Sequence, residues 1–241
     1  MARCTSPRQG VARRARQLSR DRWGPHRAWY HAAVASDREL LEAWRQGHAG
    51  SGDTLVRKHF GAVYRFFRNK VSGDLDDLVQ DTFMTCAAAR ANIRDDGSFR
   101  PYLFAVARNV LKAHYARVHK QRENFDPLES SVADLGLTPT QQIAGRQEHR
   151  LLLNALRSIT LDDQVALELV YWERLTGKEV GLVLGIPEGT ARSRLRAARQ
   201  SLEAKVAELG RSSELVVSTL DNLERWSESV REYLGSDAQP L

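Results

Sequence analysis

Cysteine is scarce in this chain of 241 residues, which contains only Cys4 and Cys86. The two do not form a C-x-x-C pair, and no cluster of His and Cys residues has the spacing of a metal site. We therefore expect neither a disulfide framework nor a structural zinc site, and a reducing compartment fits this composition.

Long apolar runs are missing as well. The sequence contains no run of about 18 apolar residues, so we expect no membrane span. The N-terminus is basic but is not followed by an apolar segment, which argues against a secretory signal.

Residue patterns that indicate catalysis are also absent from the sequence. The seven histidines show no metal spacing, and neither a G-x-S-x-G motif nor a phosphate-binding loop occurs. Paired carboxylates such as Asp76 and Asp77 are adjacent in sequence and are interpreted as solvated. We therefore expect that the protein is not an enzyme, and we assign no catalytic residue, no metal and no cofactor.

The charge is distributed unevenly along a chain with a formal net charge of +6 and a pI of about 9.6. An anionic partner fits this excess, although many basic proteins have none. Residues 1–35 hold eight arginines and one acid, whereas residues 123–145 hold four acids and no base. These shifts predict five segments: a basic N-terminal extension expected to be disordered (1–35), two central blocks (36–122 and 146–209), an acidic linker between them (123–145) and a C-terminal tail with one amphipathic helix (210–241).

Both central blocks have the pattern of helices. Gly and Pro are rare inside them, and apolar residues recur at spacings of three and four, as at Leu152, Leu156 and Ile159. Short alternating runs of β-branched residues are missing. The sequence therefore predicts an all-α fold of two small helical domains joined by a flexible linker.

A helix-turn-helix is predicted near the end of the second block. Thr176 followed by Glu179 forms a capping box, which predicts that a helix begins there. Gly185 supplies a left-handed end to this helix, and Pro187 suits the first turn of the next one. Gly181 lies where the two helices are expected to cross, so a side chain at this position would hold them apart.

The second helix of this motif has two contrasting faces. Its apolar stripe is predicted to face the domain core and consists of Ala191, Leu195, Ala198, Leu202, Val206 and Leu209. The opposite face carries small residues, with arginines on both sides of it. Such a face fits a DNA major groove, because small side chains permit close approach and guanidinium groups reach guanine edges or phosphates. The candidate DNA-binding residues are Thr190, Arg192, Ser193, Arg194, Arg196 and Arg199. A solvated basic helix on an ordinary bundle is the alternative.

Three stretches of the sequence carry a family resemblance. The stretch EVGLVLGIPEGTARSRLRAARQSL (179–202) resembles the region 4 helix-turn-helix of the bacterial sigma-70 family, in its extracytoplasmic-function (ECF) group. The stretch DLDDLVQDTFMTCAAARANI (74–93) resembles region 2.2 of the same group. It is followed by GSFRPYLFAVARNVLKAHYARVHK (97–120), which is similar to the group's next motif. The resemblance covers about residues 36–209.

The resemblance implies a protein partner for the first block. Asp77, Gln80 and Asp81 lie opposite the apolar side of their helix and form an acidic and polar face. In the family, this helix docks on the basic coiled coil of the RNA polymerase β′ clamp. Core RNA polymerase is thus the expected partner, through the β′ clamp and the β flap, and an anti-sigma factor is a further candidate partner.

The stretch 99–122 is the second candidate nucleic-acid element. It contains basic residues uninterrupted by acids and interleaved with aromatic residues, a pattern typical of a single-strand surface. In the family, this helix and the loop before it capture the non-template strand at the minus-10 element and flip out one base. The resemblance assigns this role to Arg100, Arg108, Asn109 and Lys112, with Ile93 and Phe99 at the base pocket.

Together these observations predict an ECF RNA polymerase sigma factor, located in the cytoplasm, that recognises minus-35 and minus-10 promoter DNA and directs transcription initiation. The alternative is a helix-turn-helix regulator that does not engage core polymerase. The acidic DDLVQD face (76–81) discriminates between them, because a plain regulator has no need of it. An enzyme acting on nucleic acid would need a metal or nucleophile site that the sequence does not show.

Overall fold

The structure is a computed structural model and describes residues 35–71, 73–93, 99–120, 126–135, 147–222, 225 and 228–232. Four parts of the sequence predictions lie outside these residues. They are the basic extension up to residue 34, loop residues 94–98, residues 123–125 and 136–145 of the expected linker, and Leu223, Trp226 and Leu234 of the expected tail helix.

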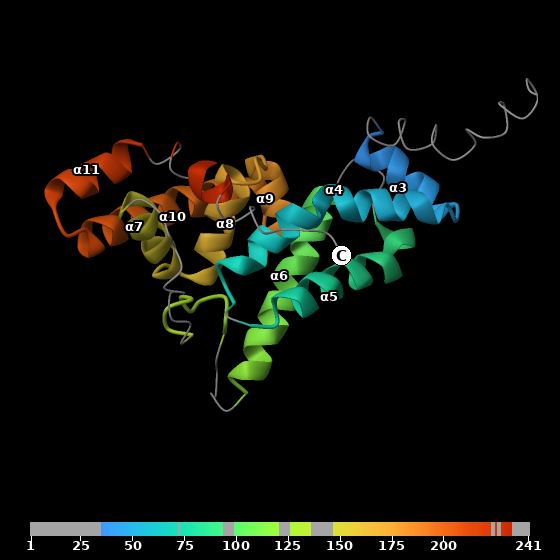
Figure 1. The fold of residues 1–241 in the computed structure, drawn as a ribbon, viewed down its shortest axis with the longest axis horizontal. Coiled ribbons are helices and arrows are strands. Elements are labelled where there is room, and N and C mark those ends of the chain that lie inside the picture. The colour runs from blue at the N-terminus through green and yellow to red at the C-terminus, as the bar shows by residue number, and fades with distance from the viewer. Residues whose placement is uncertain are drawn as a thin grey trace, which may run out of the picture.

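The described residues form helices joined by turns, which confirms the prediction of an all-α fold. In chain order the elements are α3 (Asp37–Arg45), α4 (Ala49–Arg68), α5 (Leu75–Ala88), the 3₁₀ turn η2 (Arg90–Asn92), α6 (Phe99–Val118), α7 (Gln147–Arg157), α8 (Leu161–Tyr171), α9 (Gly177–Leu184), α10 (Glu188–Leu209) and α11 (Ser213–Asp221). Figure 1 shows α3, α4, α5 and α6 on one side of the molecule and α7, α10 and α11 on the other, with α8 and α9 between them.

The first group of helices surrounds its own apolar core. Leu55, Val63 and Phe67 on α4 pack with Leu103 and Phe104 on α6, and all five are fully or almost fully buried. Burying one such side chain contributes roughly 1.5–3 kcal/mol relative to leaving it exposed. Leu55, Val63 and Phe67 recur after eight and four residues, which places them on one side of α4, and this side packs into the core that α6 shares.

The second group has a separate core beneath α10. Ala198, Leu202 and Val206 of the predicted stripe are buried there against Leu152 and Trp172. The stripe prediction is wrong at its end, because Leu209 is 40% exposed. The C-terminal tail adds α11 and Val230, which is buried in this core.

Helices α8 and α9 connect the two groups. Leu161, Val165 and Leu169 of α8 belong to the same buried cluster as the core of the first group, and so do Val180 and Val183 of α9. Helix α9 contacts both α6 and α10. The two groups are therefore packed against each other rather than held apart.

Part of the predicted linker is folded against the start of α8, in the same buried cluster as the core of the first group. Leu128, Val132 and Leu135 are buried, and Ser131 forms an isolated antiparallel bridge with Thr160. The backbone N–H of Asp162 donates to the carbonyl of Leu128 over 3.1 Å. The acidic composition of this stretch led to the prediction of a flexible linker. The three buried apolar residues, which are spaced by four and three, were not recognised as core residues.

Membrane insertion finds no support in the described helices, since none is both long and apolar enough to cross a bilayer.

Candidate functional site

The helix-turn-helix has the local geometry that the sequence predicts. Thr176 caps α9, and the Thr176 and Glu179 side chains form both bonds of the capping box. Gly185 ends the helix in the left-handed region at φ 71°. A Cβ built on Gly181 would lie 2.8 Å from the carbonyl oxygen of Ile186, so only glycine allows this approach of the backbone. The predicted crossing of the two helices is confirmed.

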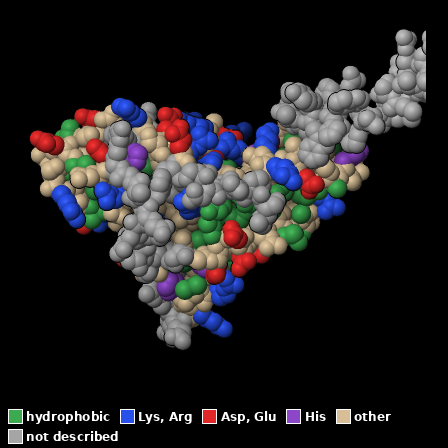
Figure 2. Space-filling view, viewed as in Figure 1, with side chains coloured by type: hydrophobic (Ala, Val, Ile, Leu, Met, Phe, Trp, Pro, Cys, Tyr) green, Lys and Arg blue, Asp and Glu red, His purple; other side chains and the backbone are tan. Residues whose placement is uncertain are grey.

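Helix α10 presents the predicted polar face to solvent. Thr190, Arg192, Ser193, Arg196 and Arg199 are all exposed, while Ala191 and Ala198 on the opposite side are buried. Figure 2 shows Lys and Arg side chains gathered near α9, on the side of the molecule where the helix-turn-helix lies. This exposed surface, with Thr190, Arg192, Ser193, Arg196 and Arg199, is called the α10 face below.

The arginines of α10 differ in their partners. Arg196 has no carboxylate partner among the residues that the structure describes. Arg192 and Arg199 pair along the helix, with Glu188 and with Glu203, the latter at 2.9 Å. Arg194 is different, because it points inward and donates to Asp162 of α8 over 2.9 Å. The structure thus separates Arg194 from the other predicted DNA-binding residues.

The predicted single-strand surface on α6 is divided in the same way. Asn109 and Lys112 are exposed, and Lys112 lies 3.6 Å from Asp126. Arg108 instead donates two hydrogen bonds to Asp162, at 2.7 and 2.8 Å, and Arg100 donates to Glu173 over 2.8 Å. These two arginines are thus occupied by carboxylates at the two ends of α8. The residues assigned to the base pocket, Ile93 and Phe99, are 3% and 2% exposed and belong to the core, so they do not line an open pocket here.

Helix α5 exposes the predicted acidic and polar face. Asp77, Gln80 and Asp81 are all exposed, whereas Leu78, Val79, Thr82 and Phe83 on the other side are buried. Figure 2 shows acidic side chains at the surface in the part of the molecule where α5 lies. The three residues therefore form one continuous surface, called the α5 face below.

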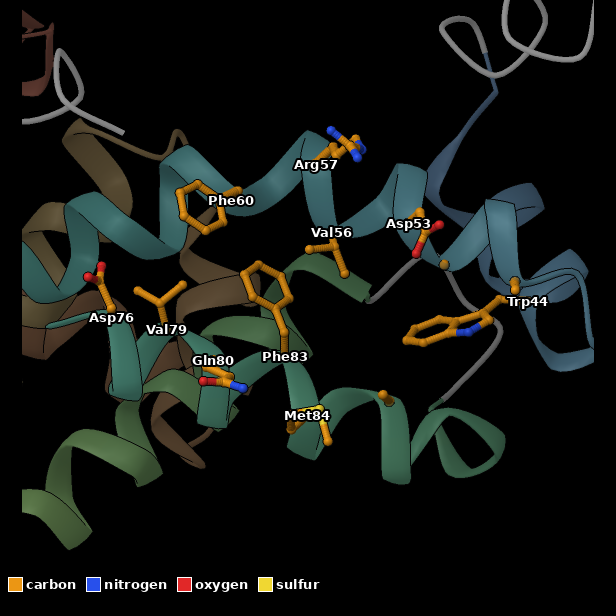
Figure 3. A pocket seen from close by; sticks show the side chains of 13 residues that line it. Trp44, Asp53, Val56, Arg57, Phe60, Asp76, Val79, Gln80, Phe83 and Met84 are labelled. Atoms are coloured by element: carbon orange, nitrogen blue, oxygen red, sulfur yellow. The ribbon is translucent and has the colours of Figure 1, made fainter. Parts of the chain in front are cut away.

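A groove of about 470 Å³ that the sequence did not predict lies beside the α5 face. Figure 3 shows Val56 and Phe60 of α4 opposite Val79 and Phe83 of α5, with Trp44 at one end. Gln80 belongs both to this groove and to the α5 face. Met84, one turn beyond Gln80, is 63% exposed and also lines the groove. Asp76, Gln80 and Met84 line the groove and are spaced by four residues along α5, so helical periodicity could have placed them on one side of the helix.

A buried polar cluster between the two helix groups also escaped sequence analysis. The Lys70 ammonium, in the turn just after α4, is fully buried and pairs with the Glu168 carboxylate on α8. Asn69 and Gln164 also donate to Glu168, at 3.3 and 2.8 Å. Burial lowers the pKa of Lys70, and the nearby Glu168 carboxylate offsets part of that effect. The local sequence does not indicate that Lys70 is buried, because its partner Glu168 is 98 residues away.

The described residues indicate neither a nucleophilic catalytic site nor a metal site. Burial raises the pKa of the Cys86 thiol to about 12, so this cysteine is not an activated nucleophile. No group of three or more His, Cys, Asp or Glu side chains in the described part of the chain could hold a metal ion.

Two family descriptions match the chain, and they match in the order of its two helix groups. The family model "Sigma-70 region 2" matches residues 55–123, and "Sigma-70, region 4" matches residues 149–202. The α5 face and α6 lie in the first match, and the helix-turn-helix lies in the second.

Curated relatives agree with these family matches, and a solved structure has a similar fold. The ECF RNA polymerase sigma-E factor of Haemophilus influenzae is 25% identical over 187 residues, which cover 74% of this chain and 99% of the relative. The protein of the same name from Escherichia coli strain K12 is 24% identical over 183 residues, which cover 72% and 96%. The structure of CnrH in complex with the cytosolic domain of CnrY has a TM-score of 0.53 and 21% identity, covering 73% of this chain and all of that one. This last likeness bears on the fold alone.

Proposed function

This chain belongs to the sigma-70 family and is an RNA polymerase sigma factor of the extracytoplasmic-function group, and on that premise we propose how its surfaces divide the work of promoter recognition. The observation that carries the proposal is the presence of both sigma regions with their polar faces on separate, exposed helices. A helix-turn-helix regulator that does not engage polymerase would need only the second region.

We assign minus-35 recognition to the α10 face. Its small residues, Thr190 and Ser193, allow close approach to the major groove, and Arg192 and Arg196 flank them. Arg199 lies one turn further along, where it can meet a phosphate. Arg194 contacts DNA only after it leaves Asp162.

We assign core polymerase binding to the α5 face and the groove beside it. Three polar or acidic side chains next to an apolar groove fit a partner helix that is basic at its rim and apolar in its centre. The basic coiled coil of the β′ clamp has this character in the resemblance described above. The second region would contact the β flap, and the division into five segments remains part of this proposal.

We assign capture of the minus-10 strand to α6, through Asn109 and Lys112 on its exposed side and Arg100 and Arg108 on the side that now faces α8. Asn109 would read a flipped base with its amide, and the cations would hold the backbone. Phosphodiester chemistry would belong to the polymerase, so this chain needs no catalytic residue. Work with core polymerase on the chromosome implies a cytoplasmic location, and an anti-sigma partner remains a prediction.

Run-off transcription tests the whole proposal. Purified core RNA polymerase is mixed with this protein and a library of bacterial promoter fragments, and core polymerase alone serves as the control. We expect discrete transcripts that start downstream of a shared minus-35 and minus-10 pair. Binding to DNA fragments without any transcript would favour the regulator that does not engage polymerase.

A further inference from the structure

A pocket lined by arginines lies beside the α10 face, where three separate parts of the chain meet. It has a volume of about 450 Å³ and lies between the turn that joins α8 to α9, helix α10, and the tail that follows α11. Arg174, Arg199 and Arg225 line it, one from each of these parts. Arg199 also belongs to the α10 face, so the pocket continues that surface. It is called the tail pocket below.

The side of α10 that faces the tail pocket is the side that carries Arg192 and Arg199. These two residues are seven positions apart, which is close to two full turns of an α-helix. A Cβ built on Gly177, at the start of α9, would lie 3.4 Å from the Arg192 side chain, and Arg174 lines the pocket together with Arg199. The segment 174–177 therefore runs along this side of α10, and Arg174 and Arg225 extend its row of cations toward the tail.

The backbone at Arg174 has a conformation that favours glycine. Its φ is 56°, in the left-handed region, and within the described part of the chain Asp74 is the only other non-glycine residue with a positive φ. A side chain at such a position costs backbone strain that glycine avoids. The ion pair with Glu228 offsets little of this cost, because both side chains are more than half exposed. The stability of the fold thus does not account for an arginine here, whereas a ligand of its guanidinium group would.

The tail is anchored on both sides of Arg225. Helix α11 packs on α7 and α10 (Figure 1), and its Thr219 is fully buried. Val230 is fully buried in the core beneath α10. Arg225 lies between these two anchors in the sequence, which holds it beside Arg174 and Arg199. The region 4 match ends at residue 202, so the part of the pocket that the tail supplies lies outside that match.

The charges of the tail pocket suit a phosphate group. Its three guanidinium groups face two carboxylates, those of Asp221 and Glu228. An exposed pair such as Arg174–Glu228 is weak, and a phosphate can accept from the same donors through bidentate hydrogen bonds. Each DNA strand presents a phosphate at about every 3.4 Å of the helix axis. A duplex seated on the α10 face therefore brings phosphates beyond Arg199 toward the pocket.

We infer that the tail pocket binds a backbone phosphate of the promoter duplex immediately outside the minus-35 element, through Arg174 and Arg225. This inference rests on the proposed function and adds a second contact to its minus-35 site. The α10 face reads the base pairs, and the tail pocket anchors the flanking backbone. Because a phosphate contact carries no sequence information, the gain in affinity should be the same for any flanking sequence and should weaken with salt.

The test compares two duplexes that carry the same minus-35 element, taken from a promoter that run-off transcription identifies. The long duplex extends beyond the element by about one helical turn, roughly 10 base pairs, on each side, and the short duplex ends about 2 base pairs after it. The full-length protein is titrated on both at several salt concentrations. Arg174→Gly and Arg225→Gln each remove one cation of the pocket. Arg211→Gln is the control, because it removes an exposed cation between α10 and α11 that does not line the pocket.

We expect each pocket variant to bind the long duplex about three- to tenfold more weakly at low salt, because one phosphate contact changes the salt slope by about one. Binding to the short duplex should stay unchanged, and the control should match the parent on both duplexes. Arg174→Gly should also unfold at an equal or higher denaturant concentration than the parent, because glycine relieves the strain at φ 56°. Weaker DNA binding in a protein of equal or greater stability is a result that a purely structural role of Arg174 would not produce.

Equal losses on the long and the short duplex would overturn the inference, and so would unchanged binding of both pocket variants to the long duplex. If Arg174→Gly is less stable and Arg225→Gln binds the long duplex normally, Arg174 serves the fold and the inference is wrong. Calorimetry with inorganic phosphate separates a second source of the same chemistry. Phosphate binding that Arg225→Gln abolishes, without any effect of duplex length, would identify a site for a small anion and refute the assignment to DNA.

The proposed function fails in a different way from this inference. A parent protein that binds neither duplex and yields no transcript refutes minus-35 recognition itself. Specific binding of the parent to both duplexes, weakened by Arg196→Ala but not by either pocket variant, refutes only the role of the tail pocket.

Discussion

Four arginines on α10 carry the same charge but have different surroundings. Arg194 is held by Asp162, Arg192 and Arg199 pair with glutamates one turn away, and Arg196 has no carboxylate partner within the described residues. Exposed pairs of the Arg199–Glu203 type contribute only about 0.3–0.5 kcal/mol, so DNA displaces them easily. The partner of each arginine thus indicates how readily it turns to DNA.

Arg196 and Arg199 are expected to contribute differently to minus-35 binding. Arg196→Ala should flatten the sequence preference by about 1–3 kcal/mol at one base pair, because a bidentate guanine contact discriminates by that amount. Arg199→Ala should weaken binding to all sequences alike and lower the salt slope by about one. Titrations on matched and single-mismatch duplexes at several salt concentrations measure both effects. If both variants change only the salt slope, then DNA shape or Thr190 and Ser193 must supply the specificity.

Asn109 is expected to act after duplex binding. Its side chain is exposed on α6, and a flipped base offers a Watson–Crick edge that a paired base does not. Asn109→Ala should therefore reduce promoter opening by the holoenzyme about tenfold or more, at a cost of roughly 1–2 kcal/mol for a lost hydrogen bond, and leave binding of the closed promoter complex unchanged. Permanganate footprinting measures opening, and gel shift measures binding. Normal melting in this variant would remove Asn109 from the base-reading role.

At the scale of single residues, sequence analysis was limited by distance along the chain. It identified exposed polar residues such as Thr190 and Asp77, because their helices have clear apolar faces. It could not tell that Arg100 and Arg108 face carboxylates, because their partners are 73 and 54 residues away. A basic residue beside an aromatic looks the same in a sequence whether it faces solvent or another helix group.

Helix α9 and the start of α10 form a unit, and the close crossing of the two helices depends on Gly181. The signals for this unit are local: a capping box, a left-handed glycine and an N-terminal proline all lie within twelve residues of sequence, 176–187. This is why sequence analysis placed the turn correctly. The burial of Leu128, Val132 and Leu135 had no comparable local signal.

Gly181→Ala should destabilise the protein by about 1–3 kcal/mol, because the new Cβ would lie 2.8 Å from the Ile186 carbonyl oxygen and must push the backbone apart. That cost outweighs the helix propensity gain of up to about 1 kcal/mol. Gly189→Ala is the matched control: no atom lies within 4 Å of its added Cβ, so it should be neutral or slightly stabilising. Denaturant unfolding measures both. Equal effects of the two substitutions would contradict the close crossing of α9 and α10.

Helix α5 carries the surface proposed to bind core polymerase. Asp77→Lys with Asp81→Lys reverses the charge on the α5 face without touching Leu78 or Phe83, which hold the helix in place. Affinity for core polymerase should fall about tenfold or more, since like charges at an interface cost several kcal/mol. Helix content should stay intact, and pull-down with purified core enzyme measures the loss. A useful control is Asp53→Lys, at the far end of the groove, where a smaller loss is expected. Unchanged core affinity would count against the clamp assignment.

At the scale of the whole molecule, one apolar cluster runs from α4 and α6 of the first group into the connecting helices α8 and α9. The fold class and the contents of each group were predictable, because each helix carries its own periodicity. Their mutual packing was not, because a helix that is apolar on two sides looks the same whether it is the centre of one domain or lies between two. Helix α8 is the example, with Val165 and Leu169 in one cluster and Leu167 in the other.

The Lys70–Glu168 pair makes this packing measurable. Lys70→Met leaves the Glu168 carboxylate buried without its cation, and Glu168→Met leaves the Lys70 ammonium buried without its anion, so each single change should cost about 3–5 kcal/mol. The double variant removes both charges, and it should be less destabilised than the sum of the singles by about 2–3 kcal/mol. Because Lys70 directly follows α4 and Glu168 lies on α8, this coupling exists only if α8 is packed against the first group in solution. Denaturant unfolding of the parent and the three variants measures it, with Lys205→Met and Glu208→Met as a cycle on an exposed pair, where coupling should stay below about 1 kcal/mol. Additive single effects at Lys70 and Glu168 would mean that the two groups are apart in the free protein.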